Sequence, residues 1–96
     1  MPVKKITCTC GQGLGSSFLV EMNVKKVLKK LGLDNIEVDH QPTSDISKGS
    51  ADLYVIAADL YDSVNQLGDT VVLTNIVSLP ELEEKLTAYL NEKGML

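Results

Sequence analysis

The chain contains no arginine and no tryptophan, and all nine of its basic residues are lysines. The lack of arginine excludes any mechanism that needs a guanidinium group to hold a phosphate or carboxylate through two parallel hydrogen bonds. Only three tyrosines and one phenylalanine are present, and the formal net charge is −4. We expect no nucleic-acid partner, because an acidic chain with so few aromatic side chains lacks the features of a nucleic-acid binder.

The chain is also poor in cysteine and has no long apolar run. Its two cysteines, Cys8 and Cys10, both lie within the first ten residues and do not make a disulfide framework. No apolar stretch approaches the ~20 residues needed to span a bilayer, and the N-terminal segment lacks the apolar region of a signal peptide. We therefore expect a cytoplasmic protein with reduced thiols that does not itself span a membrane.

The 96 residues, 44% of them apolar, are expected to form one domain, residues 1–96. Short β-branched runs alternate with segments that have helical periodicity. The predicted strands are residues 4–9, 35–39, 52–58 and 70–74. This alternation favours parallel βαβ units. We predict an α/β fold: a single-domain, doubly wound, four-stranded parallel sheet of order 2-1-3-4, with helices on both faces.

Two long helices have clear apolar stripes. The first is expected to begin near Phe18 and to end at Gly32, and its stripe is Val20, Val24, Val27, Leu28 and Leu31. The second is expected to open at Ser78 with a capping box that includes Glu81. Its stripe is Leu79, Leu82, Leu86, Tyr89 and Leu90. Shorter helical segments are expected at residues 43–48 and 59–67.

The stretch Cys-Gly-Gln-Gly-Leu-Gly-Ser-Ser, residues 10–17, follows the first predicted strand. Open parallel sheets bind ligands at this position. Glycines let such a loop point several N–H groups inward, and a helix starting near Ser16 adds unpaired N–H groups and the positive end of its dipole. We interpret the stretch as a phosphate-binding loop with its own nucleophile, Cys10. The phosphate-binding residues are expected to be Gly11, Gln12, Gly13, Leu14, Gly15, Ser16 and Ser17.

Three kinds of chemistry compete for this loop. A cysteine phosphatase would need an arginine, which the chain lacks. A dinucleotide site would need a third glycine where Ser16 stands, although Asp39 has the spacing of a ribose-binding carboxylate. A phosphoryl carrier needs only a stabilised phosphocysteine. Of the three chemistries, it therefore depends least on residues that the chain lacks. A non-catalytic nucleotide-binding module that uses the Gly11–Gly15 loop remains the alternative.

A redox pair of Cys8 and Cys10 is a further alternative. In an extended strand their Cα atoms would lie roughly 6.5–7 Å apart, near the limit for a disulfide. We expect Cys8 to be a buried strand residue instead. No metal or organic cofactor is expected, since the only histidine, His40, has no suitably spaced second ligand.

The segment from Cys10 to Leu28 resembles the enzyme IIB component of the bacterial sugar phosphotransferase system, and its ascorbate type more than its galactitol type. The resemblance implies a phosphotransferase in which Cys10 is the phosphocysteine. It also implies two partners. A histidine of the IIA phosphocarrier protein would supply the phosphate, and the sugar, ascorbate by resemblance, would receive it while bound to the membrane IIC permease.

Phe18 and Met22 project nearly opposite the apolar stripe of the first helix. Two large apolar side chains exposed one turn from the loop predict a docking surface for partner proteins. The alternatives are that Phe18 folds back over the loop, or that both are ordinary exposed apolar residues.

Overall fold

The structure is a computed structural model, and it describes the chain in several stretches. These are residues 3–9, 14–33, 35–41, 46, 49, 51–58, 62, 68–75 and 78–95, with the backbone alone for residues 14–17. In chain order, the elements are β1 (Lys5–Thr9), α1 (Leu14–Lys30), β2 (Glu37–His40), β3 (Leu53–Ala57), β4 (Thr70–Leu73) and α3 (Leu79–Glu92).

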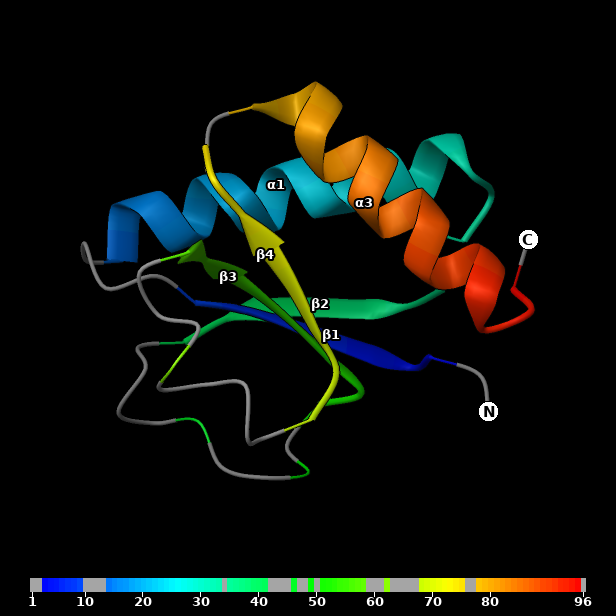
Figure 1. The fold of residues 1–96 in the computed structure, drawn as a ribbon, viewed down its shortest axis with the longest axis horizontal. Coiled ribbons are helices and arrows are strands. Elements are labelled where there is room, and N and C mark those ends of the chain that lie inside the picture. Colours follow the sequence, from blue (N-terminus) through cyan, green and yellow to red (C-terminus); the bar gives the residue numbers. More distant parts are fainter. Residues whose placement is uncertain are drawn as a thin grey trace.

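The four strands form one sheet in the order β2-β1-β3-β4, and every neighbouring pair is parallel (Figure 1). β1 is therefore flanked on both sides, with Cys8 opposite His40 of β2 and opposite Val55 of β3. The predicted α/β class, the parallel pairing and the strand order are confirmed.

The two described helices, α1 and α3, lie on the same face of the sheet, where they contact each other (Figure 1). α1 covers β1 and β2, and α3 covers β4. The side chains of alternate strand residues point to this face. The core there includes Ile6, Cys8, Val38, Leu53, Val55, Val71 and Leu73 from the sheet and Val20, Val24, Val27, Leu28, Leu82, Leu86 and Leu90 from the helices.

The opposite face of the sheet buries a smaller apolar cluster. Tyr54 and Ile56 form its centre, with Ile46, Ala51 and Val72 packed against them. We predicted helices on this face as well, at residues 43–48 and 59–67. Apart from Ile46 and Asp62, those two segments lie outside the described residues.

α1 buries four residues of its predicted stripe, Val20, Val24, Val27 and Leu28, whereas Leu31 lies just beyond the helix and is half-buried. The helix begins earlier than expected. Its first residue is Leu14 rather than a residue between Ser16 and Phe18. The N–H groups of a first turn have no partner within the helix, so the weak helix formers Gly15 and Ser16 cost less there than in the interior. At the other end, Gly32 has a φ of 78°, and the Leu33 N–H donates to the Leu28 carbonyl at 2.8 Å. This left-handed glycine ends the helix as predicted.

α3 begins at the predicted cap, since the Glu81 N–H donates to Ser78 Oγ at 3.3 Å. Leu82, Leu86 and Leu90 are buried as expected. The prediction is wrong for Leu79, which is 36% exposed. Helical spacing gives the direction of a side chain around the helix axis. It does not say whether another element lies opposite the first turn.

Leu86 and Leu79 offer a matched test of where the core ends. Leu86→Ala should lower the free energy of unfolding by about 2–5 kcal/mol, because it removes a fully buried side chain and leaves a cavity. The same change at the exposed Leu79 should stay within about 0.5 kcal/mol of wild type. Urea unfolding followed by circular dichroism measures both, and equal losses would contradict the described packing.

Candidate functional site

Parallel pairing brings the carboxyl ends of the strands to one edge of the sheet. The last strand residues are Thr9 in β1, His40 in β2, Ala57 in β3 and Leu73 in β4. Ligands of open parallel sheets bind beyond such ends. Figure 1 shows the first turn of α1 on the same side of the molecule as these strand ends. Thr9 and Leu14, which flank residues 10–13 in the sequence, therefore both belong to this edge.

The predicted nucleophile lies outside the described residues, and so does half of the predicted binding loop. Cys10, Gly11, Gln12 and Gly13 are not described, and Leu14, Gly15, Ser16 and Ser17 are described only as helix backbone. Their assignment to phosphate binding therefore stays a prediction.

Four of the predicted phosphate-binding residues lie in a different element from the one expected. Residues 14–17 form the first turn of α1 instead of a loop before the helix. Their N–H groups are those that a helix leaves without an internal partner. The first turn contains no acidic residue, so no carboxylate of the helix itself offsets the positive end of its dipole. An anion beyond this turn would be favoured.

Cys8 is 0% exposed and belongs to the core between the sheet and the helices. The prediction that it is a buried strand residue is confirmed. Because its side chain is enclosed by the core, the Cys8 thiol is not accessible to a partner protein in this structure.

Asp39, which the dinucleotide alternative requires, is held on the face of the sheet away from the helices. The Thr7 hydroxyl donates to its carboxylate at 2.7 Å, and the Gln41 amide donates at 3.1 Å. Lys5 Nζ lies 3.5 Å from the same carboxylate. Since these side chains already occupy the carboxylate, the structure does not favour Asp39 as a ribose ligand. Among the residues that are described, no three His, Cys, Asp or Glu side chains gather into a possible metal site.

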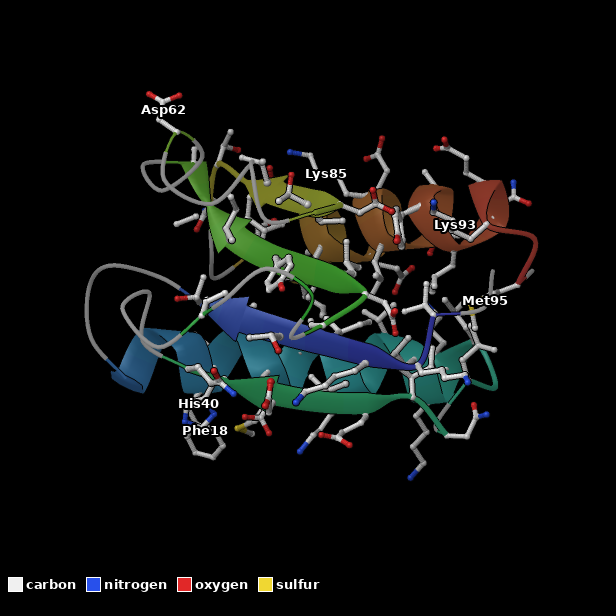
Figure 2. The ribbon with its side chains drawn as sticks, turned by 90° about the horizontal axis from the view of Figure 1, so that it is seen from below. Phe18, His40, Asp62, Lys85, Lys93 and Met95 are labelled. Carbon is white, nitrogen blue, oxygen red and sulfur yellow. The ribbon has the colours of Figure 1, made fainter. Side chains whose placement is uncertain are left out.

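A polar cluster missed by the sequence analysis joins α1 to the end of β2. Glu21 is 8% exposed, and its carboxylate contacts Nδ1 of His40 and lies 2.6 Å from Nζ of Lys25. The ring of Phe18 lies against the His40 ring, with centroids 5.6 Å apart (Figure 2). The spacing of Glu21 and Lys25 suits a helical ion pair. No local pattern indicates that His40 completes the cluster.

Burial by itself would raise the pKa of Glu21. Hydrogen bonds from Lys25 and His40, together with their charges, outweigh this effect and hold the pKa below its ordinary value. Glu21 is therefore ionised at neutral pH. An ionised carboxylate can only accept hydrogen bonds, so Nδ1 of His40 must carry the hydrogen in this contact.

Three large apolar side chains of α1 are exposed shortly after its first turn. Phe18 is 51% exposed, Leu19 38% and Met22 42%. We call these three residues the apolar patch. The predicted exposure of Phe18 and Met22 is confirmed, and Leu19 joins them. Phe18 contacts the ring of His40 at the edge of the sheet.

Glu81 organises the turn that follows β4. Its carboxylate accepts from the Thr74 N–H at 2.9 Å, the Thr74 hydroxyl at 2.7 Å and the Asn75 N–H at 2.9 Å. Lys85 Nζ lies 2.9 Å away. The Lys85 hydrogen bond, followed by those from Thr74 and Asn75, lowers the pKa of Glu81 from 4.5 to about 2. Only the Ser78 half of the predicted capping box is therefore formed, because the Ser78 N–H donates to the Asn75 carbonyl and the Glu81 side chain binds the end of β4 instead.

Residues 5–90 match the model of one protein family, described as the lactose/cellobiose-specific IIB subunit of the PTS system. The match covers every strand and nearly all of α3. The chain belongs to this family. A search of curated proteins found no match to this IIB domain.

Family membership makes this IIB domain a phosphotransferase component of a sugar phosphotransferase system, with IIA and IIC components as its partners. The description of the matching family is of the lactose/cellobiose type, and it does not support the ascorbate or galactitol type expected from the sequence. In the part of the chain that the structure describes, neither helix has the length and apolar character to cross a membrane.

Glu81→Gln tests the turn after β4. A carboxylate whose pKa is lowered on folding stabilises the protein above its unfolded pKa, and this contribution is lost as the pH falls through the folded pKa. We expect Glu81→Gln to lower the melting temperature at pH 7, and the difference from wild type to shrink between pH 4.5 and about 2. Thermal unfolding followed by circular dichroism from pH 2 to 7 measures it.

The matched control is Glu84→Gln, at an exposed position of the same helix. Its melting temperature should follow that of wild type at every pH. A Glu81→Gln deficit of the same size at pH 2 and at pH 7 would contradict the ionic origin of this contact.

Proposed function

We propose that this IIB domain carries a phosphoryl group on Cys10. In the first step, the Cys10 thiolate attacks the phosphorus of a phosphohistidine on the IIA protein. The sulfur–phosphorus bond forms as the nitrogen–phosphorus bond breaks. In the second step, a sugar hydroxyl oxygen bound by the IIC component attacks the phosphorus and loses its proton, and Cys10 leaves as the thiolate.

The observation that carries this proposal is the place of Cys10 in the chain. It directly follows Thr9, the last residue of β1, and four undescribed residues separate Thr9 from Leu14, the first residue of α1. A thiol at a helix N-terminus ionises more readily than a free thiol. Unpaired N–H groups at such an end bind phosphate oxygens. The first turn of α1 contributes such groups and brings no carboxylate to oppose them.

The composition of the chain supports transfer to another acceptor over release to water. Gly11, Gln12 and Gly13 would donate N–H groups, as would the first turn of α1, with the Ser16 and Ser17 hydroxyls as further donors. No arginine is present to stabilise the transition state of hydrolysis. A phosphocysteine formed here should therefore persist until a partner accepts its phosphate.

The apolar patch is proposed as the docking surface for the IIA protein. Phe18, Leu19 and Met22 are all more than one third exposed, and they lie in the second and third turns of α1, the helix that follows the proposed nucleophile in the sequence. Apolar and aromatic side chains of this kind form the buried centres of protein interfaces.

Two different resemblances propose two different kinds of sugar. The segment from Cys10 to Leu28 resembles the ascorbate type, whereas the matching family is described as lactose/cellobiose-specific. Phosphoryl transfer from the phosphorylated domain to ascorbate, lactose and cellobiose, each with the corresponding IIC permease in membrane vesicles, separates them.

Cys10 can be tested by intact-mass spectrometry. The protein would be incubated with phosphoenolpyruvate, the general phosphotransfer proteins and the IIA protein. We expect the mass of one phosphoryl group to be gained by wild type and by Cys8→Ser, and not by Cys10→Ser. Peptide mapping should place the group on Cys10.

No gain by wild type, with all partners shown to be active, would contradict the carrier function. Nucleotide binding that survives in Cys10→Ser would then favour the binding module. Phosphorylation of Cys10→Ser at the wild-type level would place the carrier on another residue.

Met22→Ala and Phe18→Ala test the docking surface. Each should raise the KM for phosphorylated IIA protein by roughly fivefold or more, since truncating an important interface residue costs about 1 kcal/mol or more. Stability should barely change, because both side chains are exposed. Leu79→Ala, which truncates an exposed leucine on α3, is the matched control and should leave the KM unchanged. Unchanged KM values for both α1 variants would contradict docking at this patch.

A further inference from the structure

Little of the described side-chain surface at the start of α1 faces the sheet. Phe18, Leu19 and Met22 are exposed, and between them only Val20 and Glu21 are buried. Val20 belongs to the core, but Glu21 carries a carboxylate that must find polar partners when it is withdrawn from water. These partners decide how the first two turns of α1 are held.

His40 is the partner that comes from the sheet. Its Nδ1 contacts the Glu21 carboxylate, and its ring lies 5.6 Å from the Phe18 ring between centroids, at an interplanar angle of 34° (Figure 2). The other partner of Glu21, Lys25, comes from α1 itself. Lys25 can therefore neutralise the carboxylate, but it cannot tie the helix to the sheet.

His40 is in turn fixed relative to β1. It pairs with Cys8 in the parallel register, and the next residue, Gln41, donates its N–H to the Cys8 carbonyl at 3.1 Å. Cys8 stands two residues before Cys10. His40 thus connects the strand that leads to Cys10 with the helix that follows it.

We propose that His40 is a positioning residue for Cys10. Through its hydrogen bond to Glu21, it sets the N-terminal turn of α1, and with it the N–H groups of that turn, relative to the end of β1. This inference rests on the proposed carrier function. Only residues 10–13 separate β1 from α1 in the sequence, so we expect a shift of the helix to change its position relative to Cys10.

Substitution of His40 can separate its hydrogen bond to Glu21 from its ring contact with Phe18. His40→Asn keeps an amide N–H close to the position of Nδ1, so it can still donate to Glu21. His40→Phe keeps a ring against Phe18 but removes the donor and leaves the buried carboxylate with Lys25 alone. If the hydrogen bond positions α1, the asparagine variant retains function and the phenylalanine variant loses it.

The first readout is the single-turnover rate of phosphoryl transfer from phosphorylated IIA protein at saturating concentration. We expect His40→Phe to lower this rate about tenfold, because misplacement by about 1 Å can cost up to 10²-fold. The KM should change little. His40→Asn should recover most of the rate. A docking defect would instead raise the KM, and a loss of stability alone would lower the melting temperature without slowing the folded protein.

The second readout is the rate of Cys10 alkylation by iodoacetamide as a function of pH, in the Cys8→Ser background. This small reagent needs no docking surface. We expect the pH-rate profile of His40→Phe to shift toward higher pH, since a displaced helix N-terminus would stabilise the thiolate less. His40→Asn should keep the wild-type profile.

Glu21→Gln, on α1, and Glu83→Gln, on α3, form a matched pair, because each removes a carboxylate that contacts one end of α1. Glu21→Gln weakens the contact with His40, whereas Glu83→Gln removes an ion pair with Lys30, at 3.0 Å, at the far end of the helix. Only the first should slow transfer and shift the alkylation profile. If His40→Phe fails to fold, the comparison of Glu21→Gln with Glu83→Gln still tests the positioning role of His40.

The possible failures can be told apart. If wild type takes up phosphate but both His40→Phe and Glu21→Gln match Glu83→Gln in both readouts, the positioning role of His40 is overturned and the carrier function stands. If wild type with active partners takes up no phosphate, the carrier function is overturned, and the positioning role with it.

Discussion

The parallel pairing of β1 between β2 and β3 is the constraint on which the rest of the site depends. It makes β1 a buried central strand and directs its carboxyl end to the edge where the other strands end. Because few residues connect β1 to α1, the N-terminus of the helix must return to this same edge. A helix terminus with unpaired N–H groups at this edge favours a bound anion. The carrier function of the family is consistent with this geometry.

The two described helices differ in the carboxylates at their N-termini. α3 has Glu81 in its first turn, and this carboxylate binds the N–H groups of Thr74 and Asn75 at the end of β4. α1 has no acidic residue in its first turn, and its nearest carboxylate, Glu21, is turned toward Lys25 and His40. The Glu81 carboxylate thus binds the backbone at the end of β4, whereas the first turn of α1 contains no carboxylate of its own.

Much of the fold could be predicted because it follows from local periodicity. The apolar stripe of α1, its end at Gly32 and the cap at Ser78 are properties of neighbouring residues, and the structure confirms them. The start of α1 was misplaced because glycine and serine are weak helix formers, although the first turn tolerates them. The exposure of Leu79 was missed because periodicity does not reveal where the packing partner of a helix stops.

The amino-acid sequence by itself determined the α/β class and the position of Cys10 between a strand and a helix, because alternating periodicities and glycines are local signals. The strand order was predicted correctly as well, but it is a long-range property that the tertiary structure decides. Only the tertiary structure decided that Glu21 meets His40, nineteen residues away, and that Glu81 holds the turn after β4. These contacts depend on the register of β2 against β1 and on the side of the sheet that each helix covers. Both are settled by packing, and no short segment of the chain encodes them.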